Sequence, residues 1–113
     1  MFVLELTYAA PVDRVDPLVA DHHHWVDAQF AAGTFILSGR KSTRDGGVIL
    51  AAGDDRAALD ALIATDPFVI GEVCAYRITE FVAARTAPGL TEYRERPPGG
   101  PRTNAAVPVP TGE

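Results

Sequence analysis

Cysteine, basic charge and long apolar runs are all scarce in this sequence, and each shortage excludes a class of protein. The single cysteine, Cys74, cannot form a disulfide within the chain, which favours a reducing, cytoplasmic setting. No apolar stretch approaches the ~20 residues of a membrane span, and the first ten residues lack the basic region of a signal peptide. Ten basic residues against fifteen acidic ones leave a net charge of −5, so no segment is basic enough to hold a nucleic-acid backbone. We therefore expect neither a nucleic acid nor a membrane as partner.

The sequence does hold enough apolar material for one domain of modest size. The chain has 113 residues and is 47% hydrophobic, which predicts a single folded unit. Residues 86–113 differ from the rest, because they contain six of the nine prolines and their apolar residues are sparse and aperiodic. Such a segment cannot bury enough surface to offset the entropy lost on ordering. We predict a folded domain over residues 1–85 and a mostly disordered tail over residues 86–113.

Hydrophobic periodicity within residues 1–85 predicts six elements. Strands are expected over residues 2–8, 34–38, 48–51 and 72–81, and helices over about 16–32 and 56–65. The Asp16-Pro17 pair is typical of a helix start, although residues 12–16 could add an earlier turn, and Gly33 is typical of a helix end. The Asp45-Gly46 pair is typical of a tight hairpin turn.

The order of these elements, β-α-β-β-α-β, predicts an α+β, ferredoxin-like fold. In this arrangement one antiparallel sheet carries both helices on one face. The other face is left open, and a second copy of the chain is the simplest cover for it if it is apolar. We therefore expect a homodimer.

Three consecutive histidines, His22, His23 and His24, fall in the first predicted helix. Successive helical side chains point about 100° apart, so the three cannot converge on one ion, and we expect no metal site. On the helical wheel His22 falls inside the apolar stripe of the helix, whereas His24 points almost opposite. His22 is therefore expected to face the sheet, either as a buried histidine satisfied by the backbone or as a functional residue.

Asp66 is the candidate partner of His22. It follows the second predicted helix, and the ends of two helices that lie side by side on a sheet can meet. A carboxylate there would accept a hydrogen bond from one imidazole nitrogen and so fix the tautomer. An aspartate before Pro67 is equally typical of an ordinary turn, and the sequence leaves both interpretations open.

Five short motifs over residues 2–82 form a pattern shared with a known family. They are His22-x-x-Trp25, residues 33–39 ending in Leu-Ser-Gly, residues 46–50, Asp66-Pro67-Phe68, and residues 76–81. In these motifs the sequence resembles the YCII-related (YciI-like) domain family. The resemblance implies a ferredoxin-like domain of the dimeric α+β barrel type, which dimerises through its sheets, with a His–Asp pair as its active site. By position these residues are His22 and Asp66, and neither His23 nor His24 matches the motif.

The resemblance implies a small-molecule ligand but leaves the reaction open. One similar enzyme removes chloride from a chlorinated hydroxyquinol, and the related barrels include muconolactone isomerases and monooxygenases that need no cofactor. Here Arg40-Lys41 follows Gly39 where some members have proline. We expect a lyase or isomerase without a cofactor, in which His22, held by Asp66, abstracts a proton made acidic by a nearby carbonyl. The alternative is a dimeric module that binds a metabolite without transforming it.

Candidates for binding the substrate are Ser38, Arg40 and Lys41, near the end of the second predicted strand. They could donate hydrogen bonds to developing negative charge. They could equally be an ordinary strand end followed by solvated hairpin charges. Trp25 either lines the same pocket or belongs to the core.

Overall fold

The computed structural model describes residues 1–96, which fall into two compact units: Met1–Glu80, and a second that begins at Phe81. In the second unit a 3₁₀ helix, η2, spans Pro88–Tyr93. The remainder of the predicted tail, residues 97–113, lies outside the described residues. The predicted boundary near residue 85 and the disorder of the tail therefore stay predictions.

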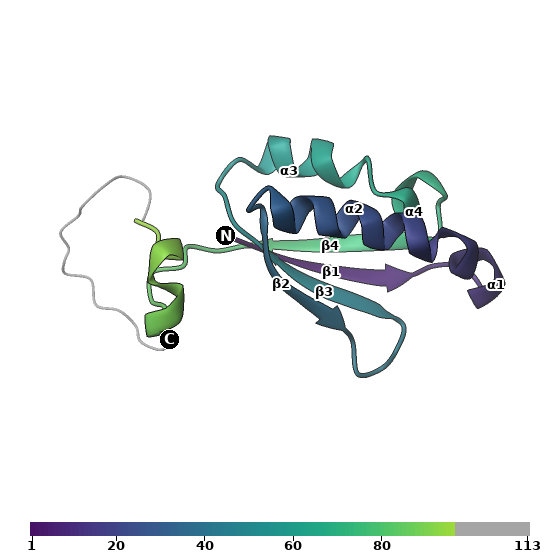
Figure 1. Cartoon of the computed structure of the whole chain (residues 1–113), viewed down its shortest axis with the longest axis horizontal. Coiled ribbons are helices and arrows are strands. Elements are labelled where there is room, and N and C mark those ends of the chain that lie inside the picture. The colour runs from purple at the N-terminus through teal and green to yellow at the C-terminus, as the bar shows by residue number, and fades with distance from the viewer. Residues whose placement is uncertain (97–113) are drawn as a thin grey trace. The chain divides into compact units, whose positions relative to one another are not determined.

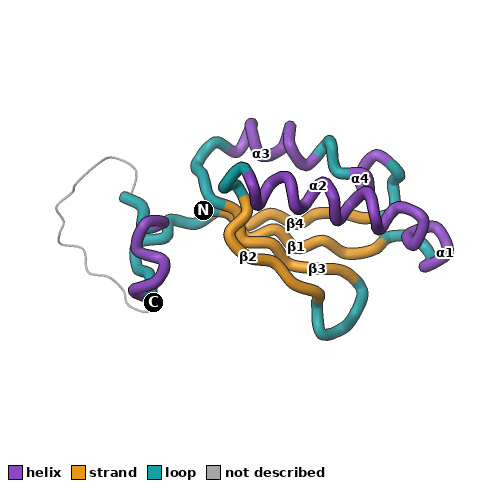
Figure 2. The backbone as a smooth tube through the Cα atoms, viewed as in Figure 1, coloured by secondary structure: helices purple, strands orange, loops and turns teal. Residues whose placement is uncertain are grey.

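The first unit is a four-stranded antiparallel sheet with its helices on one face (Figures 1 and 2). The strands are β1 (Phe2–Tyr8), β2 (Phe35–Arg40), β3 (Gly46–Ala51) and β4 (Cys74–Glu80). They lie in the order β2-β3-β1-β4, and each neighbouring pair is antiparallel. This confirms the predicted ferredoxin-like α+β arrangement.

The first helical segment begins at Val12, which confirms the alternative of an earlier turn before Asp16-Pro17. It consists of α1 (Val12–Val15), a 3₁₀ turn η1 (Asp16–Leu18) and α2 (Val19–Ala31). The prediction that Asp16 caps the helix is wrong, because Pro11 is the N-cap of α1 and Asp16 lies inside the continuous helical segment. Pro17 has no N–H for an α-helical hydrogen bond, which accounts for the tighter 3₁₀ geometry at this point.

Gly33 ends α2 as predicted. It has a φ of +82°, a left-handed conformation that favours glycine. Its N–H donates to the carbonyl of Phe30 at 3.1 Å, and the N–H of Thr34 donates to the carbonyl of Gln29 at 3.0 Å. This pair of bonds is a Schellman motif, and it turns the chain directly into β2.

The second helical region divides in two at Asp66. Helix α3 spans Arg56–Ile63, shorter than predicted, and a short helix α4, which was not predicted, spans Pro67–Ile70. Asp66 is the N-cap of α4, with Pro67 at the first helical position. The Asp-Pro pair therefore ends one helix and begins another.

The hairpin between β2 and β3 also differs from the prediction. Gly46 already belongs to β3 and is paired with Thr7, so the Asp45-Gly46 pair does not form the turn. The loop spans residues 41–45 and closes through a bond from the N–H of Arg44 to the carbonyl of Lys41 at 2.8 Å. Arg44 takes up the left-handed conformation that the loop requires, with a φ of 66°.

The core lies between the helices and the sheet. Its buried residues are Phe2, Leu4, Leu6, Val15, Phe35, Ile49, Ala51, Leu59, Ile63, Phe68 and Val73. On the opposite face of the sheet, Leu37 lies across from Leu50, which lies across from Val3. Among residues 1–96, no helix has the length and apolar character needed to cross a bilayer.

Candidate functional site

His22 projects from α2 toward the sheet, as the helical wheel predicts. Its side chain is only 12% exposed, whereas His23 and His24 are exposed. The imidazole stacks almost parallel on the ring of Phe68, with the ring centroids 4.0 Å apart and 9° between the planes. This stacking fixes the plane of the imidazole and leaves rotation within that plane to be set by hydrogen bonds.

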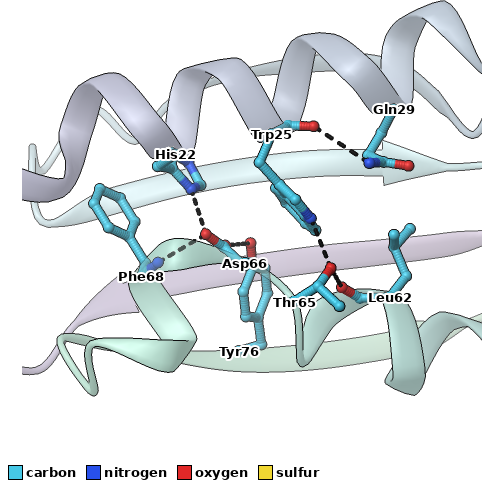
Figure 3. A network of polar contacts seen from close by, with 8 residues as sticks. All are labelled: His22, Trp25, Gln29, Leu62, Thr65, Asp66, Phe68 and Tyr76. Carbon is cyan, nitrogen blue, oxygen red and sulfur yellow. Dashed lines mark hydrogen bonds and ion pairs between the residues drawn. The ribbon is translucent and has the colours of Figure 1, made fainter.

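Asp66 provides the hydrogen bond that sets it. The carboxylate is fully buried, and its Oδ1 lies 2.8 Å from Nδ1 of His22 (Figure 3). The same oxygen accepts from the backbone N–H of Phe68 at 2.9 Å, which is the N-cap bond of α4. The structure thus brings the two predicted residues together, and it does so by using the local capping role of Asp66.

Tyr76 completes the set of donors around Asp66. Its hydroxyl donates to Oδ2 of Asp66 at 2.6 Å. Burial, together with this bond to Asp66, raises the pKa of Tyr76 far above its ordinary value, so the phenol keeps its proton and acts as a donor. Tyr76 was not among the site residues predicted from the sequence. The available signal was a tyrosine on the same face of the last strand as Ile78, where a buried hydroxyl needs a partner.

The donors around Asp66 determine the tautomer of His22. Because Asp66 accepts from the N–H of Phe68 and the O–H of Tyr76, its carboxylate is an acceptor, and Nδ1 of His22 carries the hydrogen. The other ring nitrogen, Nε2, has no hydrogen-bond partner among the described residues. In the neutral imidazole Nε2 therefore presents a free lone pair, as a general base requires.

Trp25 is partly buried and packs against the hydrophobic core. Its indole N–H donates to Oγ1 of Thr65 at 2.9 Å, and the Thr65 hydroxyl donates in turn to the carbonyl of Leu62 at 2.6 Å (Figure 3). The indole also packs edge-on against Phe35. Trp25 lies beside His22, with the ring centroids 6.0 Å apart, but it does not line the cavity that His22 lines.

That cavity has a volume of about 470 Å³ and lies between the first helical segment and β1, β2 and β3. Its apolar walls include Val12, Val15, Val19, Val26, Ile49 and Phe68. Its polar lining includes His22, Ser38, Arg40 and Arg44. Ser38 and Arg40 thus lie where the sequence placed them, in the same cavity as His22.

A bulge in β2 brings Ser38 and Arg40 to this side of the sheet. The register between β2 and β3 shifts between Phe35 and Leu37, so Ser38 pairs with Ile49 of the core and Arg40 pairs with Gly47. Strict alternation from Phe35 would have turned both side chains to the other face.

Lys41 does not join Arg40 at the cavity. Its ammonium lies 3.1 Å from Oε2 of Glu5 and 3.0 Å from Oγ1 of Thr7, and it pairs with Asp45 at 3.3 Å. The bond to Glu5 raises the pKa of Lys41. The expectation that Lys41 donates to a substrate therefore has no support from its position.

The described residues offer few ligands for a metal. Within them, no group of three or more histidine, cysteine, aspartate or glutamate side chains is placed to hold an ion. The ring centroid of His23 lies 5.9 Å from that of His22, and His23 lines the same cavity. The polar side chains that line the cavity are imidazoles, hydroxyls, guanidinium groups and one carboxylate.

Comparison with known proteins agrees with this fold. The model of the YCII-related domain family matches residues 1–82. No curated protein matches the chain. A similar solved structure is that of the 5-chloro-2-hydroxyhydroquinone dehydrochlorinase from Burkholderia phenoliruptrix AC1100, in complex with 2,5-dihydroxybenzoquinone. The two share 14% identity with a TM-score of 0.57, over 72% of this chain and 93% of that one, and this similarity shows a common fold.

Proposed function

The chain belongs to the YCII-related domain family, and we propose that it is a small lyase or isomerase that acts without a cofactor. The proposed general base is His22, positioned by Asp66. The observation that carries the proposal is that Nδ1 of His22 lies 2.8 Å from a fully buried carboxylate, while His22 also lines a cavity of about 470 Å³.

In the proposed step, Nε2 of His22 takes a proton from a carbon next to a carbonyl group. The electron pair of the broken C–H bond moves onto the carbonyl oxygen and gives an enolate. Return of the proton from the imidazolium to a different carbon isomerises the substrate. If the enolate instead expels a leaving group with its bonding pair, the reaction is an elimination, and the imidazolium then releases its proton to water.

A positioned general base accounts for part of such catalysis, about 10²–10⁴-fold. The developing oxyanion needs donors as well. Ser38 and Arg40 line the cavity and are the donors we assign to this role. The volume is large enough for a small cyclic metabolite, and the dehydrochlorinase of similar fold was solved in complex with 2,5-dihydroxybenzoquinone.

Hydrogen exchange with solvent tests the proposal across a panel of candidate substrates. We would incubate cyclic ketones, lactones and hydroxylated quinones with the protein in D₂O and follow the loss of C–H signals by proton NMR. Wild type should catalyse exchange for at least one compound, and His22→Gln should slow it by about 10²-fold or more. The matched control is His24→Gln, because His24 is exposed on the same helix and does not line the cavity.

Exchange that persists in His22→Gln would contradict the assignment of the base. A compound that binds wild type but shows neither exchange nor turnover would favour the alternative, a module that binds a metabolite without transforming it.

We also propose that the active form is a homodimer joined through the open face of the sheet. Support comes from the apolar residues on this face, of which Leu37 is 51% exposed and Val48 36% exposed. Sedimentation equilibrium should give twice the mass of one chain for wild type and the mass of one chain for Leu37→Glu. A monomeric wild type at micromolar concentration would refute this assembly.

A further inference from the structure

Two arginines of the β2–β3 hairpin line the cavity together with His22. Arg40 is the last residue of β2, and Arg44 lies in the loop that follows. Neither guanidinium forms a hydrogen bond or an ion pair with another residue of the described part of the chain. The cavity lining therefore carries two guanidinium groups without an ion-pair partner among the described residues.

Two acidic residues of the neighbouring strand and hairpin loop are engaged with Lys41. Glu5 and Asp45 both pair with Lys41, and Asp45 also accepts from the hydroxyl of Thr43. Asp16, in η1, is the one acidic residue among those that line the cavity. In a chain with a net charge of −5, the lining of this cavity thus holds two arginines against one aspartate.

The backbone at Arg44 adds a second indication. Its φ of 66° places a residue other than glycine in the left-handed region, which costs of the order of 1 kcal/mol. The bond from its N–H to the carbonyl of Lys41 holds this conformation. An asparagine or a glycine would fit the turn with less strain, so the local backbone gives no reason for an arginine here.

We propose that the ligand of this cavity carries a carboxylate, which Arg40 and Arg44 bind. The planar guanidinium matches the two oxygens of a carboxylate and stays charged at all relevant pH values. The apolar wall of Val12, Val15, Val19 and Val26 then receives the hydrocarbon body of the ligand. This inference rests on the proposed function for the direction in which the ligand's reactive carbon points, toward His22.

Paired probes test the charge that the cavity selects. Isothermal titration calorimetry would compare benzoate with benzamide, and cinnamate with cinnamamide, so that shape is kept and charge is removed. Phenyl phosphate would separate a preference for carboxylate from a preference for any oxyanion. The arginine variants are Arg40→Gln and Arg44→Gln, and the matched control is Arg56→Gln, because Arg56 is exposed on α3, away from the open face of the sheet, and does not line the cavity.

We expect at least one carboxylate to bind wild type about 10-fold or more tightly than its amide, the usual scale of a charge-assisted hydrogen bond. Each cavity variant should reduce this preference by about 10-fold, and Arg56→Gln should change it by less than about twofold. Equal binding of acid and amide, no binding of any carboxylate, tighter binding of phenyl phosphate, or equal losses in all three arginine variants would each overturn the proposal.

The same compounds separate this inference from the proposed function. Arginine-dependent binding of a carboxylate without hydrogen exchange in D₂O would overturn proton abstraction by His22 and leave the carboxylate site standing. Exchange on neutral substrates that depends on His22, together with equal binding of each acid and its amide, would do the reverse.

Discussion

Because the side chains of Asp66 and Tyr76 are directly hydrogen-bonded, we expect substitutions of the two residues to have non-additive effects on the free energy of unfolding. Asp66→Asn keeps the shape of the side chain and its ability to cap α4, but it removes the charge. Three donors approach this fully buried carboxylate: Nδ1 of His22, the N–H of Phe68 and the hydroxyl of Tyr76. A bond to a charged acceptor contributes ~1.5–3 kcal/mol and a neutral one ~0.5–1.5, so the variant should lose about 3 kcal/mol of unfolding free energy.

Tyr76→Phe should cost about 1.5–3 kcal/mol, because it leaves Oδ2 of Asp66 buried without its partner. In the double variant this cost largely disappears, since the charge is already gone. The double variant should therefore lose about 1–2 kcal/mol less unfolding free energy than the sum of the losses in the two single variants. This difference lies within the range of directly bonded pairs. Urea unfolding followed by circular dichroism measures all four corners of the cycle. Additivity within about 0.5 kcal/mol, or an Asp66→Asn variant as stable as wild type, would refute the reasoning.

Two further predictions concern pH and backbone geometry. Burial, with a contribution from the charge of Asp66, raises the pKa of Cys74 from 9.0 to about 12, and burial raises that of Tyr76 above 10.0. The folded state then holds protons that the unfolded state has lost, so stability should stay level up to about pH 9 and fall toward pH 12. Urea unfolding over this range should show a shallower fall for Cys74→Ala, and an unchanged slope would contradict the assignment. Gly46→Ala should lose at least about 2 kcal/mol, since φ is +153° and a Cβ would lie 1.8 Å from the carbonyl oxygen of Leu6. Gly39→Ala, with no atom within 4 Å of its Cβ, is the control, and equal losses in the two variants would disprove the steric argument.

The fold could be predicted because hydrophobic period and helix-end signals agree along most of the chain. Alternation over residues 2–8 and the glycine after α2 both report local preferences that the final packing keeps. The start of the first helix and the hairpin loop could not be predicted in the same way. Pro17 is typical of a helix start but lies inside the helical segment. At Gly46 the conformation is decided by the close approach of Leu6, which is distant in sequence.

The candidate site likewise contains residues that the sequence could predict and residues that it could not. The wheel position of His22 follows from the helix alone, and the match of Asp66 followed from resemblance to a family. Tyr76 was missed because its partner is set by the pairing of β4 with β1, which no short-range pattern shows. The side of the sheet on which Arg40 lies depends on a bulge in β2, and one inserted residue reverses every later side chain.

The central claim is that buried Asp66 holds His22 with its hydrogen on Nδ1 and leaves Nε2 free. Long-range proton–nitrogen correlation NMR reads this directly, because protonated and unprotonated ring nitrogens of a neutral imidazole differ widely in nitrogen shift. Spectra of wild type and His22→Gln would assign the His22 signals among the three histidines of the chain. We predict a protonated Nδ1 and an unprotonated Nε2 in the neutral ring. A His22 imidazole with its hydrogen on Nε2 would contradict the claim and remove the general base from the proposed mechanism.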